Sequence, residues 1–336
     1  MKTFNPLLEP NHIPVMLDEV IQICSSFKNG VFLDCTFGGG GYAKALLKLN
    51  NSKVISIDRD NVVSKFADKI KKKYPKRFFF HQEKFSNLDK TLKDKKIDAA
   101  VFDLGISSFQ IEDLSRGFSF KSKEKLNMSM GLTSLTAEDV INTLDEKKIK
   151  LIIKTFGEEK DASLIAKNII KTREKKQIVT VDQLVEIIEK SKKKDLYKRN
   201  VCTKTFQAIR IFVNKEISEI IEGIIKATKY LKPGGKLIVV SFHSLEDKII
   251  KFYFSNYSSN KSNPSRYLPQ ENNPKPSLFT NYKNKIFTPS LEEKNSNDRS
   301  RSAKLRVATR NKDNFFSPKD LKIKFKKFLE IEENYG

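Results

Sequence analysis

The sequence predicts an α/β protein built around a parallel sheet, and three observations carry that prediction. Short apolar segments of strand length recur at 31–33, 53–57 and 97–102, and segments with helical spacing of apolar residues lie between them. Four consecutive glycines follow the first segment. Each segment ends in an acid, so carboxylates fall at the carboxyl ends of strands, where open α/β sheets bind their ligands.

The glycine stretch organises the rest of the chain. Val31–Leu33 is a strand that ends in Asp34, and a helix begins near Ala43, so Gly38–Gly41 form the turn between them. Glycine is needed there because the turn requires positive φ and because a side chain would keep the backbone away from a ligand. The helix presents free N–H groups and its positive dipole end to that ligand. This order is typical of a nucleotide-binding unit.

Three further residues extend the same site. Asp58 ends the second strand, about 20 residues after the first glycine, where an acid can bind both hydroxyls of a ribose. We therefore expect a cofactor with an adenosine-like half. Phe85 follows a third strand at 78–81, and its ring either stacks on the adenine or belongs to the core. Asp103 ends the fourth strand, at the edge where such sheets do their chemistry.

The alternation of strands and helices stops near Leu114 and resumes near residue 203. Between them, Thr136 has the character of a helix cap. Helical segments are predicted near 136–144, 146–155, 159–173 and 180–191. A helix from Thr203 through Ile224 then returns to the sheet, and Pro233-Gly234-Gly235 turns into a fifth strand that His243 ends.

The C-terminal part is predicted with less regular structure. A helix spans 247–254, and the polar stretch 255–285 favours a flexible loop. A basic turn at 299–303 enters a last strand that could be antiparallel, and the tail from Phe315 favours an amphipathic helix. The domains expected are a sheet domain in two parts, an inserted helical domain and a basic tail: 1–112 with 205–310, then 113–204, then 311–336. Residues 1–12 are expected to be an irregular arm.

Composition limits the function classes. The net charge of +23 among 336 residues favours a polyanionic partner such as nucleic acid, although a lysine-rich proteome would also explain it. No apolar run approaches the ~18 residues of a membrane helix, and no signal peptide is evident, so we expect a cytoplasmic protein. Three cysteines without metal-ligand spacing predict neither a disulfide framework nor a metal site.

Two cofactor classes fit the glycine loop. Gly38, Gly40 and Ala43 match the G-x-G-x-x-A pattern of NAD-dependent dehydrogenases. The Pro-Gly-Gly turn before the fifth strand and an antiparallel last strand are habits of S-adenosylmethionine-dependent methyltransferases. No second nucleotide-binding half follows residue 111, which also favours a methyltransferase.

Longer motifs resemble one family. They run in order over about 300 residues and include HIPVMLDEV at 12–20, DCTFGGGG at 34–41, DLGISSFQ at 103–110, RGFSF at 116–120, FGEE at 156–159, TFQAIRIFVNKE at 205–216, PGGKLIVVSFHSLED at 233–247 and RSRSAKLRVA at 299–308. The chain resembles the RsmH (MraW) family, which methylates N4 of a cytosine in the decoding centre, at the P site, of 16S ribosomal RNA. The resemblance implies a Rossmann-like class I S-adenosylmethionine-dependent methyltransferase sheet with an inserted all-helical domain.

The resemblance also implies roles for residues. The cofactor, S-adenosyl-L-methionine, would lie on the glycine loop and the strand ends, at Gly38, Gly40, Gly41, Tyr42, Asp58, Phe85, Asp103 and Gln110. Asp103 is the candidate acceptor for the amine N–H, with Ser107 and His243 as weaker candidates. If Asp103 instead binds the amino group of the cofactor, the acceptor could be a backbone carbonyl. The RNA phosphates would be held by basic residues, namely Arg116, Lys204, Arg210, Arg299 and Arg301.

The chain departs from the family pattern at several positions. Tyr42 stands where the family usually has His, but its backbone N–H remains. The family's P-L-D-M-R-M-D run is replaced by Lys125–Gly131, and its His-Pro-Ala-Thr-Arg run by Asn200–Lys204. These changes motivate an alternative, a methyltransferase-like RNA-binding protein that has lost turnover. The family precedent makes the 30S subunit the expected partner and leaves homodimerisation open.

Overall fold

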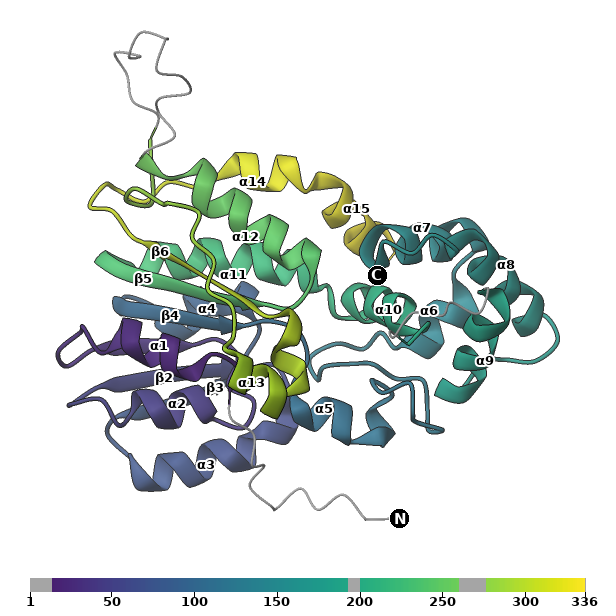
Figure 1. Ribbon diagram of the computed structural model, residues 1–336, viewed down its shortest axis with the longest axis horizontal. Coiled ribbons are helices and arrows are strands. Elements are labelled where there is room, and N and C mark those ends of the chain that lie inside the picture. The colour runs from purple at the N-terminus through teal and green to yellow at the C-terminus, as the bar shows by residue number, and fades with distance from the viewer. Residues whose placement is uncertain (1–13, 193–199, 260–275, 336) are drawn as a thin grey trace, which may run out of the picture. The chain divides into compact units, whose positions relative to one another are not determined.

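The computed structural model describes residues 14–192, 200–259 and 276–335 (Figure 1). The chain divides into two compact units. The sheet unit comprises Glu9–Gly105 and Glu219–Lys324, and the helical unit comprises Ile106–Ser218 together with the C-terminal Phe325–Gly336. The helical unit therefore extends beyond the insertion expected at 113–204 at both of its ends. It also takes up the last part of the expected basic tail.

The sheet has six strands in the order β3-β2-β1-β4-β5-β6. Their bounds are Val31–Asp34 (β1), Lys53–Asp58 (β2), Phe78–Gln82 (β3), Ile97–Asp103 (β4), Leu231–Ser241 (β5) and Lys304–Thr309 (β6). The first five strands pair in parallel, and β6 pairs antiparallel with β5. The predicted α/β sheet with an antiparallel last strand is confirmed.

The central strands are buried on both faces. Phe32 and Leu33 in β1, and Ala99 to Phe102 in β4, are fully buried. Parallel strands covered by helices on both sides read as continuous apolar runs, which is why these segments could be recognised in the sequence. In Figure 1, α12 and α14 lie on one side of the sheet, and α2 and α3 lie on the other. The helices of the sheet unit are α1 (Leu17–Cys24), α2 (Gly41–Leu46), α3 (Ser64–Lys73), α4 (Leu88–Leu92), most of α11 (Glu216–Tyr230), α12 (Ser244–Asn256), α13 (Leu291–Ser296) and α14 (Lys319–Lys324).

The helical unit contains the predicted run of helices. Thr136 forms a capping box with Asp139, which confirms the predicted cap. The helices are α5 (Ser108–Glu112), α6 (Ala137–Thr143), α7 (Glu146–Gly157), α8 (Ala162–Arg173), α9 (Val181–Ser191), α10 (Thr203–Asn214) and α15 (Lys326–Tyr335). Among the described residues, no helix is long and apolar enough to cross a membrane.

Two predicted helix and strand limits are wrong. The helix expected from Thr203 through Ile224 is interrupted at Lys215, whose φ of +50° ends α10 before α11 begins. A non-glycine residue at positive φ carries no sequence signal of its own. The fifth strand ends at Ser241, so His243 does not end it and instead caps α12.

The segment predicted as a flexible loop, 255–285, is packed at its described ends. Leu278 and Phe279 are fully buried, and the Phe279 ring lies 5.3 Å from Tyr253 and 5.2 Å from Phe254 between centroids. The described ends of the segment are therefore packed, and its flexibility stays a prediction. The rest of the loop, 260–275, lies outside the described residues, as does the expected arm. The tail forms two helices, α14 and α15, instead of one.

Candidate active site

The glycine loop joins β1 to α2 in the sheet unit. Gly38 and Gly40 have φ values of +50° and +75°, which confirms the predicted need for positive φ. Gly40 is also enclosed, because a Cβ there would lie 2.6 Å from Cδ1 of Ile70. A Cβ on Gly41 would lie 2.2 Å from Cγ of Pro14, so space and not φ requires that glycine. The loop therefore tolerates no side chain at Gly40 or Gly41 without movement.

Asp58 ties this loop to the end of β2. Its Oδ2 accepts a hydrogen bond from the Gly38 N–H at 2.8 Å, and its Oδ1 accepts one from the Asp60 N–H at 2.9 Å. Burial raises the pKa of Asp58 to about 6, against the two backbone hydrogen bonds that lower it. Each carboxylate oxygen has a second lone pair, so the group can still accept hydrogen bonds from two ligand hydroxyls.

Asp103 lies at the end of β4 with an unsatisfied carboxyl group. Its backbone N–H donates to Oγ1 of Thr36 at 2.7 Å. Its Oδ1 is buried and has no hydrogen-bond partner among the described residues. Burial, and then the nearby charges of Asp34, Glu246 and Glu293, raise the pKa of Asp103 well above its usual value. An orphaned carboxyl oxygen among like charges is a site that a cation or a strong donor would satisfy.

Asp34 adds a second acid of the same kind, which sequence reasoning did not place in the site. It ends β1 and is fully buried, with Oδ1 accepting from the Thr36 N–H at 3.2 Å and Oδ2 without a partner among the described residues. Burial raises its pKa to about 7. Its position as the last residue of β1, a few residues before the glycine loop, was the available signal. Glu246 and Glu293, distant in sequence, had none.

Phe85 and Tyr42 take different places in the site. Phe85 is half-buried in a short 3-10 helix after β3, and its ring packs edge-on against Phe102 with centroids 5.3 Å apart. Whether its remaining face stacks on an adenine stays a prediction. Tyr42 is buried in the first turn of α2, and its hydroxyl donates to the Val15 carbonyl. The Tyr42 side chain is thus a core residue, which leaves its backbone for ligand contact.

His243 is engaged as a helix cap. Its Nδ1 accepts from the Glu246 N–H at 3.4 Å, and Oε2 of Glu246 accepts from the Phe242 N–H at 2.7 Å. Nε2 of His243 lies 3.0 Å from Oε1 of Glu246 and is buried without a hydrogen-bond partner among the described residues. The cap through Nδ1 fixes the imidazole, and the catalytic role of His243 stays a prediction.

Ser107 and Gln110 belong to the helical unit, where they form a capping box at the start of α5. The Ser107 N–H donates to Oε1 of Gln110 at 2.9 Å, and Oγ of Ser107 accepts from the Gln110 N–H at 3.4 Å. Both side chains thus stabilise the turn after β4. Their predicted contacts with substrate and cofactor stay predictions.

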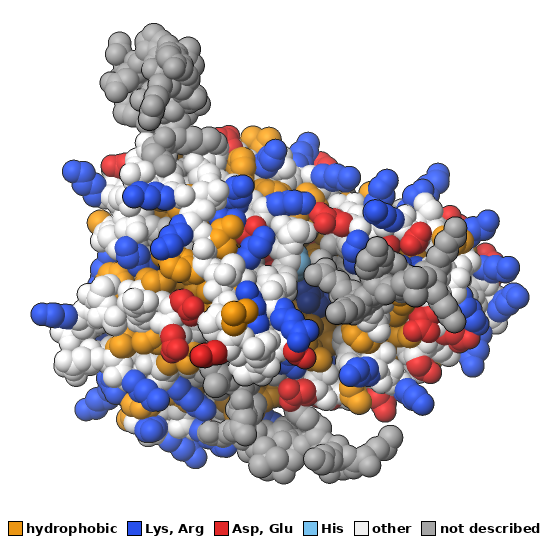
Figure 2. All heavy atoms as spheres, viewed as in Figure 1, with side chains coloured by type: hydrophobic (Ala, Val, Ile, Leu, Met, Phe, Trp, Pro, Cys, Tyr) orange, Lys and Arg blue, Asp and Glu red, His pale blue; other side chains and the backbone are white. Residues whose placement is uncertain are grey.

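The five basic residues expected to hold RNA differ in availability. Arg210 forms a bidentate ion pair with Glu216 at 2.7 and 2.9 Å, and Arg116 donates to the Ser129 carbonyl at 2.7 Å. Lys204 is exposed. In the sheet unit, Arg301 is exposed and pairs with Asp298, and Arg299 is half-buried. Figure 2 shows lysine and arginine side chains spread over the visible face, interspersed with acids.

The departures from the family pattern are accommodated in the helical unit. Oδ1 of Asn127 accepts from the Ser129 N–H at 2.8 Å, and Gly131 has a φ of +90°. Asn214 accepts from the Met130 N–H at 2.8 Å and so fixes the same segment to α10. The substituted run is consequently ordered by its own hydrogen bonds.

Comparison with known proteins identifies the family. The MraW methylase family matches residues 9–311. The chain belongs to this family. Proteins named ribosomal RNA small subunit methyltransferase H are similar to it: that of Ehrlichia canis is 42% identical over 304 residues, covering 88% of this chain and 98% of the relative. That of Rickettsia prowazekii is 41% identical over 298 residues, covering 88% and 97%.

Solved structures of other proteins are also similar to this member of the MraW methylase family. A putative rRNA-methylase from Clostridium thermocellum has a TM-score of 0.39 at 13% identity, covering 89% of this chain and 99% of that one. A putative methyltransferase from Streptococcus mutans in complex with SAH gives the same values. The cofactor of the MraW methylase family is S-adenosylmethionine. The orphaned oxygens of Asp34 and Asp103 fit its positive charge, and Asp58 fits its ribose.

Proposed function

We propose that this chain transfers a methyl group from S-adenosylmethionine to the N4 amine of a cytosine in the decoding centre of small-subunit ribosomal RNA. Family membership supports methylation of ribosomal RNA, and the printed names of the relatives support the small subunit. The observation that carries the chemistry is the buried, unpartnered Oδ1 of Asp103 at the end of β4. The N4 position, the P site, the 30S particle as partner and homodimerisation are parts of the proposal that rest on the family resemblance.

The cofactor half of the site follows from the sheet unit. Bound S-adenosylmethionine supplies an electrophilic methyl group on a sulfonium. Asp58 accepts from the ribose hydroxyls while it holds Gly38 in place, and Gly40 and Gly41 leave the backbone bare for close approach. The carboxyl groups of Asp34 and Asp103 would hold the positively charged part of the ligand. That charge would lower their raised pKa values and favour the ionised forms.

The acceptor half depends on the same aspartate. The cytosine amine is a poor nucleophile because its lone pair is delocalised into the ring. A carboxylate that accepts one N–H of the amine would favour pyramidal nitrogen and would receive the proton as the methyl–nitrogen bond forms and the methyl–sulfur bond breaks, with S-adenosylhomocysteine as the leaving group. Ionised Asp103 can do this, and its backbone bond to Thr36 fixes its position. If Asp103 binds the amino group of the cofactor instead, a backbone carbonyl takes the acceptor role.

The RNA must also be bound, and its target base must be able to reach the site. A cytosine within folded RNA must leave its stack to reach Asp103 at the carboxyl end of β4. Phosphate contacts from exposed cations such as Lys204 and Arg301 would offset that cost. Arg210 contributes less, since Glu216 already neutralises it.

The experiment is methyl transfer from labelled S-adenosylmethionine to small ribosomal subunits from a strain that lacks the endogenous modification. Wild type, Asp103→Asn and a matched surface control, Asp94→Asn, are compared, together with RNA binding by each. Asp94 is exposed and lies in the loop before β4. Label in wild type and in the control, with a large loss in Asp103→Asn at unchanged RNA affinity, supports the proposal. RNA binding without label in wild type would favour the RNA-binding alternative, which the substituted Lys125–Gly131 run motivates.

A further inference from the structure

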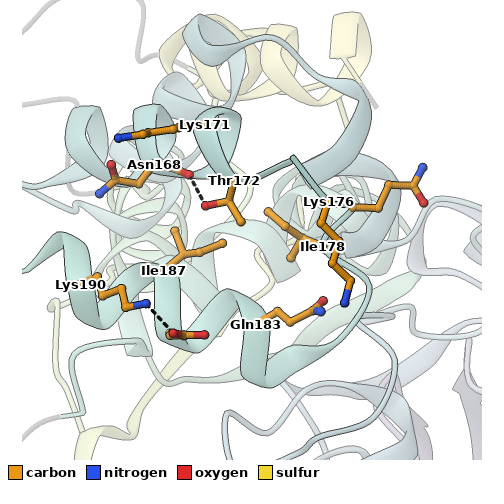
Figure 3. A pocket seen from close by; sticks show the side chains of 10 residues that line it. Asn168, Lys171, Thr172, Lys176, Ile178, Gln183, Ile187 and Lys190 are labelled. Atoms are coloured by element: carbon orange, nitrogen blue, oxygen red, sulfur yellow. Dashed lines mark hydrogen bonds and ion pairs between the residues drawn. The ribbon is translucent and has the colours of Figure 1, made fainter. Parts of the chain in front are cut away.

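The cavity between α8 and α9 in the helical unit has a volume of about 530 Å³ (Figure 3). Its apolar lining residues, Ile178 and Ile187, are only 1% and 7% exposed. Oε1 of Gln183 already accepts from the N–H groups of Val179 and Thr180 at 2.8 and 3.1 Å. Surface lysines therefore account for most of what this cavity offers a ligand, which is too little to define a site.

In the sheet unit, by contrast, the turn that carries Phe85 is bound closely by α11. Phe85–Asn87 form a 3-10 turn after β3, and Ser86 is its middle residue. The Ser86 N–H donates to Oε2 of Glu219 at 3.1 Å, and the Ser86 hydroxyl donates to Oε1 of the same carboxylate at 2.8 Å. Nζ of Lys226, two helical turns further along α11, donates to the Ser86 carbonyl at 2.5 Å. Two side chains of α11 thus hold the N–H, the hydroxyl and the carbonyl of the residue that follows Phe85.

The same helix also packs against the side chain of Phe85. Gly223, one turn after Glu219, lies so close that a Cβ there would come within 2.7 Å of the Phe85 Cβ and 3.2 Å of its Cγ. The ring of Phe102 packs edge-on against the Phe85 ring, with centroids 5.3 Å apart. Phe85 is nevertheless only half-buried. Its ring is therefore held in place while part of it stays accessible to a ligand.

The turn is also connected to the acid that is expected on the ribose. The N–H of Glu83, just before the turn, donates to the Asp58 carbonyl at 2.9 Å. Oε1 of Glu83 accepts from the Lys84 N–H at 3.0 Å and from Nδ2 of Asn87 at 2.8 Å. The start of the turn is thus fixed to β2, and its middle is fixed to α11. Both attachments are needed to hold an aromatic ring at one distance from a ribose on Asp58.

We propose that Glu219 is a positioning residue for the adenine half of S-adenosylmethionine. Its carboxylate holds Ser86, and thereby holds the ring of Phe85 in the place where the adenine stacks. A ring that is fixed before binding loses little conformational entropy when a base stacks on it, so more of the stacking energy contributes to affinity. Glu219 acts through Phe85 and not by contact with the cofactor. The inference rests on the predicted contact between Phe85 and the adenine, which belongs to the cofactor half of the proposed function.

Two ligands separate the adenine contact from the rest of the cofactor site. S-adenosylhomocysteine carries the base, and S-ribosylhomocysteine has a hydroxyl group in its place. In calorimetric competition titrations, Glu219→Ala should weaken the binding of S-adenosylhomocysteine about tenfold, within the range for stacking of a base on an aromatic side chain. The binding of S-ribosylhomocysteine should be unchanged. Glu219→Gln keeps one acceptor oxygen for Ser86 and should lose less affinity than Glu219→Ala.

The same helix provides a matched control. Glu222 is three residues after Glu219 and forms its ion pair with Lys322 of α14. Glu222→Ala therefore removes the same type of side chain from α11 and should leave the affinity for both ligands unchanged. Thermal unfolding followed by circular dichroism checks that each variant is folded. A general loss of structure would lower the affinity for both ligands alike, whereas displacement of the Phe85 ring lowers only the one that depends on the base.

A double-mutant cycle tests whether Glu219 acts through Phe85. Phe85→Ala should weaken the binding of S-adenosylhomocysteine by about tenfold or more, and Glu219→Ala added to it should cause no further loss. Additive losses in the double variant would overturn the proposal. Equal losses for the two ligands in Glu219→Ala, or an unchanged affinity for S-adenosylhomocysteine, would overturn it as well.

The outcome for Glu219 is independent of the outcome for the proposed function. Methyl transfer by the wild type, with an S-adenosylhomocysteine affinity that Glu219→Ala leaves unchanged, removes only the positioning role. A loss of affinity in Glu219→Ala that depends on the base, without methyl transfer by the wild type, supports the positioning role and removes only the proposed activity.

Discussion

Replacing Asp103 by asparagine separates the two roles open to this residue. The side chain keeps its size, but its charge and one acceptor are lost. The Oδ1 atom is buried without a partner among the described residues, so a ligand cation there would gain a charge-assisted hydrogen bond of about 1.5–3 kcal/mol. We expect Asp103→Asn to weaken S-adenosylmethionine binding by roughly 10- to 150-fold if that cation is bound directly.

The assay is calorimetric titration with S-adenosylmethionine and with S-adenosylhomocysteine, whose sulfur is neutral but whose amino group is the same. Equal losses for both ligands would assign Asp103 to the amino group. A larger loss for S-adenosylmethionine would assign it to the sulfonium. Unchanged binding of both, with a methyl-transfer rate reduced by a factor of about 10² or more, would make Asp103 the acceptor for the substrate amine. Unchanged binding and unchanged rate would refute the reasoning from the orphaned oxygen.

Three other predictions follow from the same site. Because burial holds the pKa values of Asp34 and Asp58 at about 7 and about 6, above those of unfolded aspartate, the ligand-free protein should lose stability as pH rises from 4 to 7, by several kcal/mol in urea titrations. Saturating cofactor should reduce that loss, and a stability that rises over this range would contradict it. Tyr42→Phe removes the hydrogen bond to Val15 and should cost about 1 kcal/mol of unfolding free energy with cofactor affinity unchanged, so a selective loss of affinity would give the hydroxyl a ligand role. Gly40→Ala forces a side chain to positive φ and to within 2.6 Å of an α3 methyl group, and should lower cofactor affinity at least tenfold, whereas wild-type affinity would show that the loop can rearrange.

The sequence predicted the framework of the site because its signals are local. Apolar runs mark buried strands, and the glycines mark the turn whose φ values they permit. Asp58 and Asp103 could be placed because each is the last residue of its strand. The spacing of residues along the sequence does not show which other acids lie near Asp103 in the folded protein.

The remaining features depend on tertiary contacts. Glu246 and Glu293 are more than 140 residues away from Asp103, yet their charges act on its pKa. The capping role of His243 does have a sequence signal, because His243 and Glu246 have the spacing of a capping box. The packing of Leu278 and Phe279 was missed because the stretch around them is polar, and composition says little about two buried apolar residues within it.

The most direct test of the central claim is nucleoside analysis of small-subunit ribosomal RNA after incubation with the protein and S-adenosylmethionine. Mass spectrometry of the digested RNA should find one new modified nucleoside, N4-methylcytidine, at a single decoding-centre position. Its amount should fall at least a hundredfold with Asp103→Asn if Asp103 is the amine acceptor. A methyl group on another atom or base, or none on small subunits that the protein binds, would contradict the account.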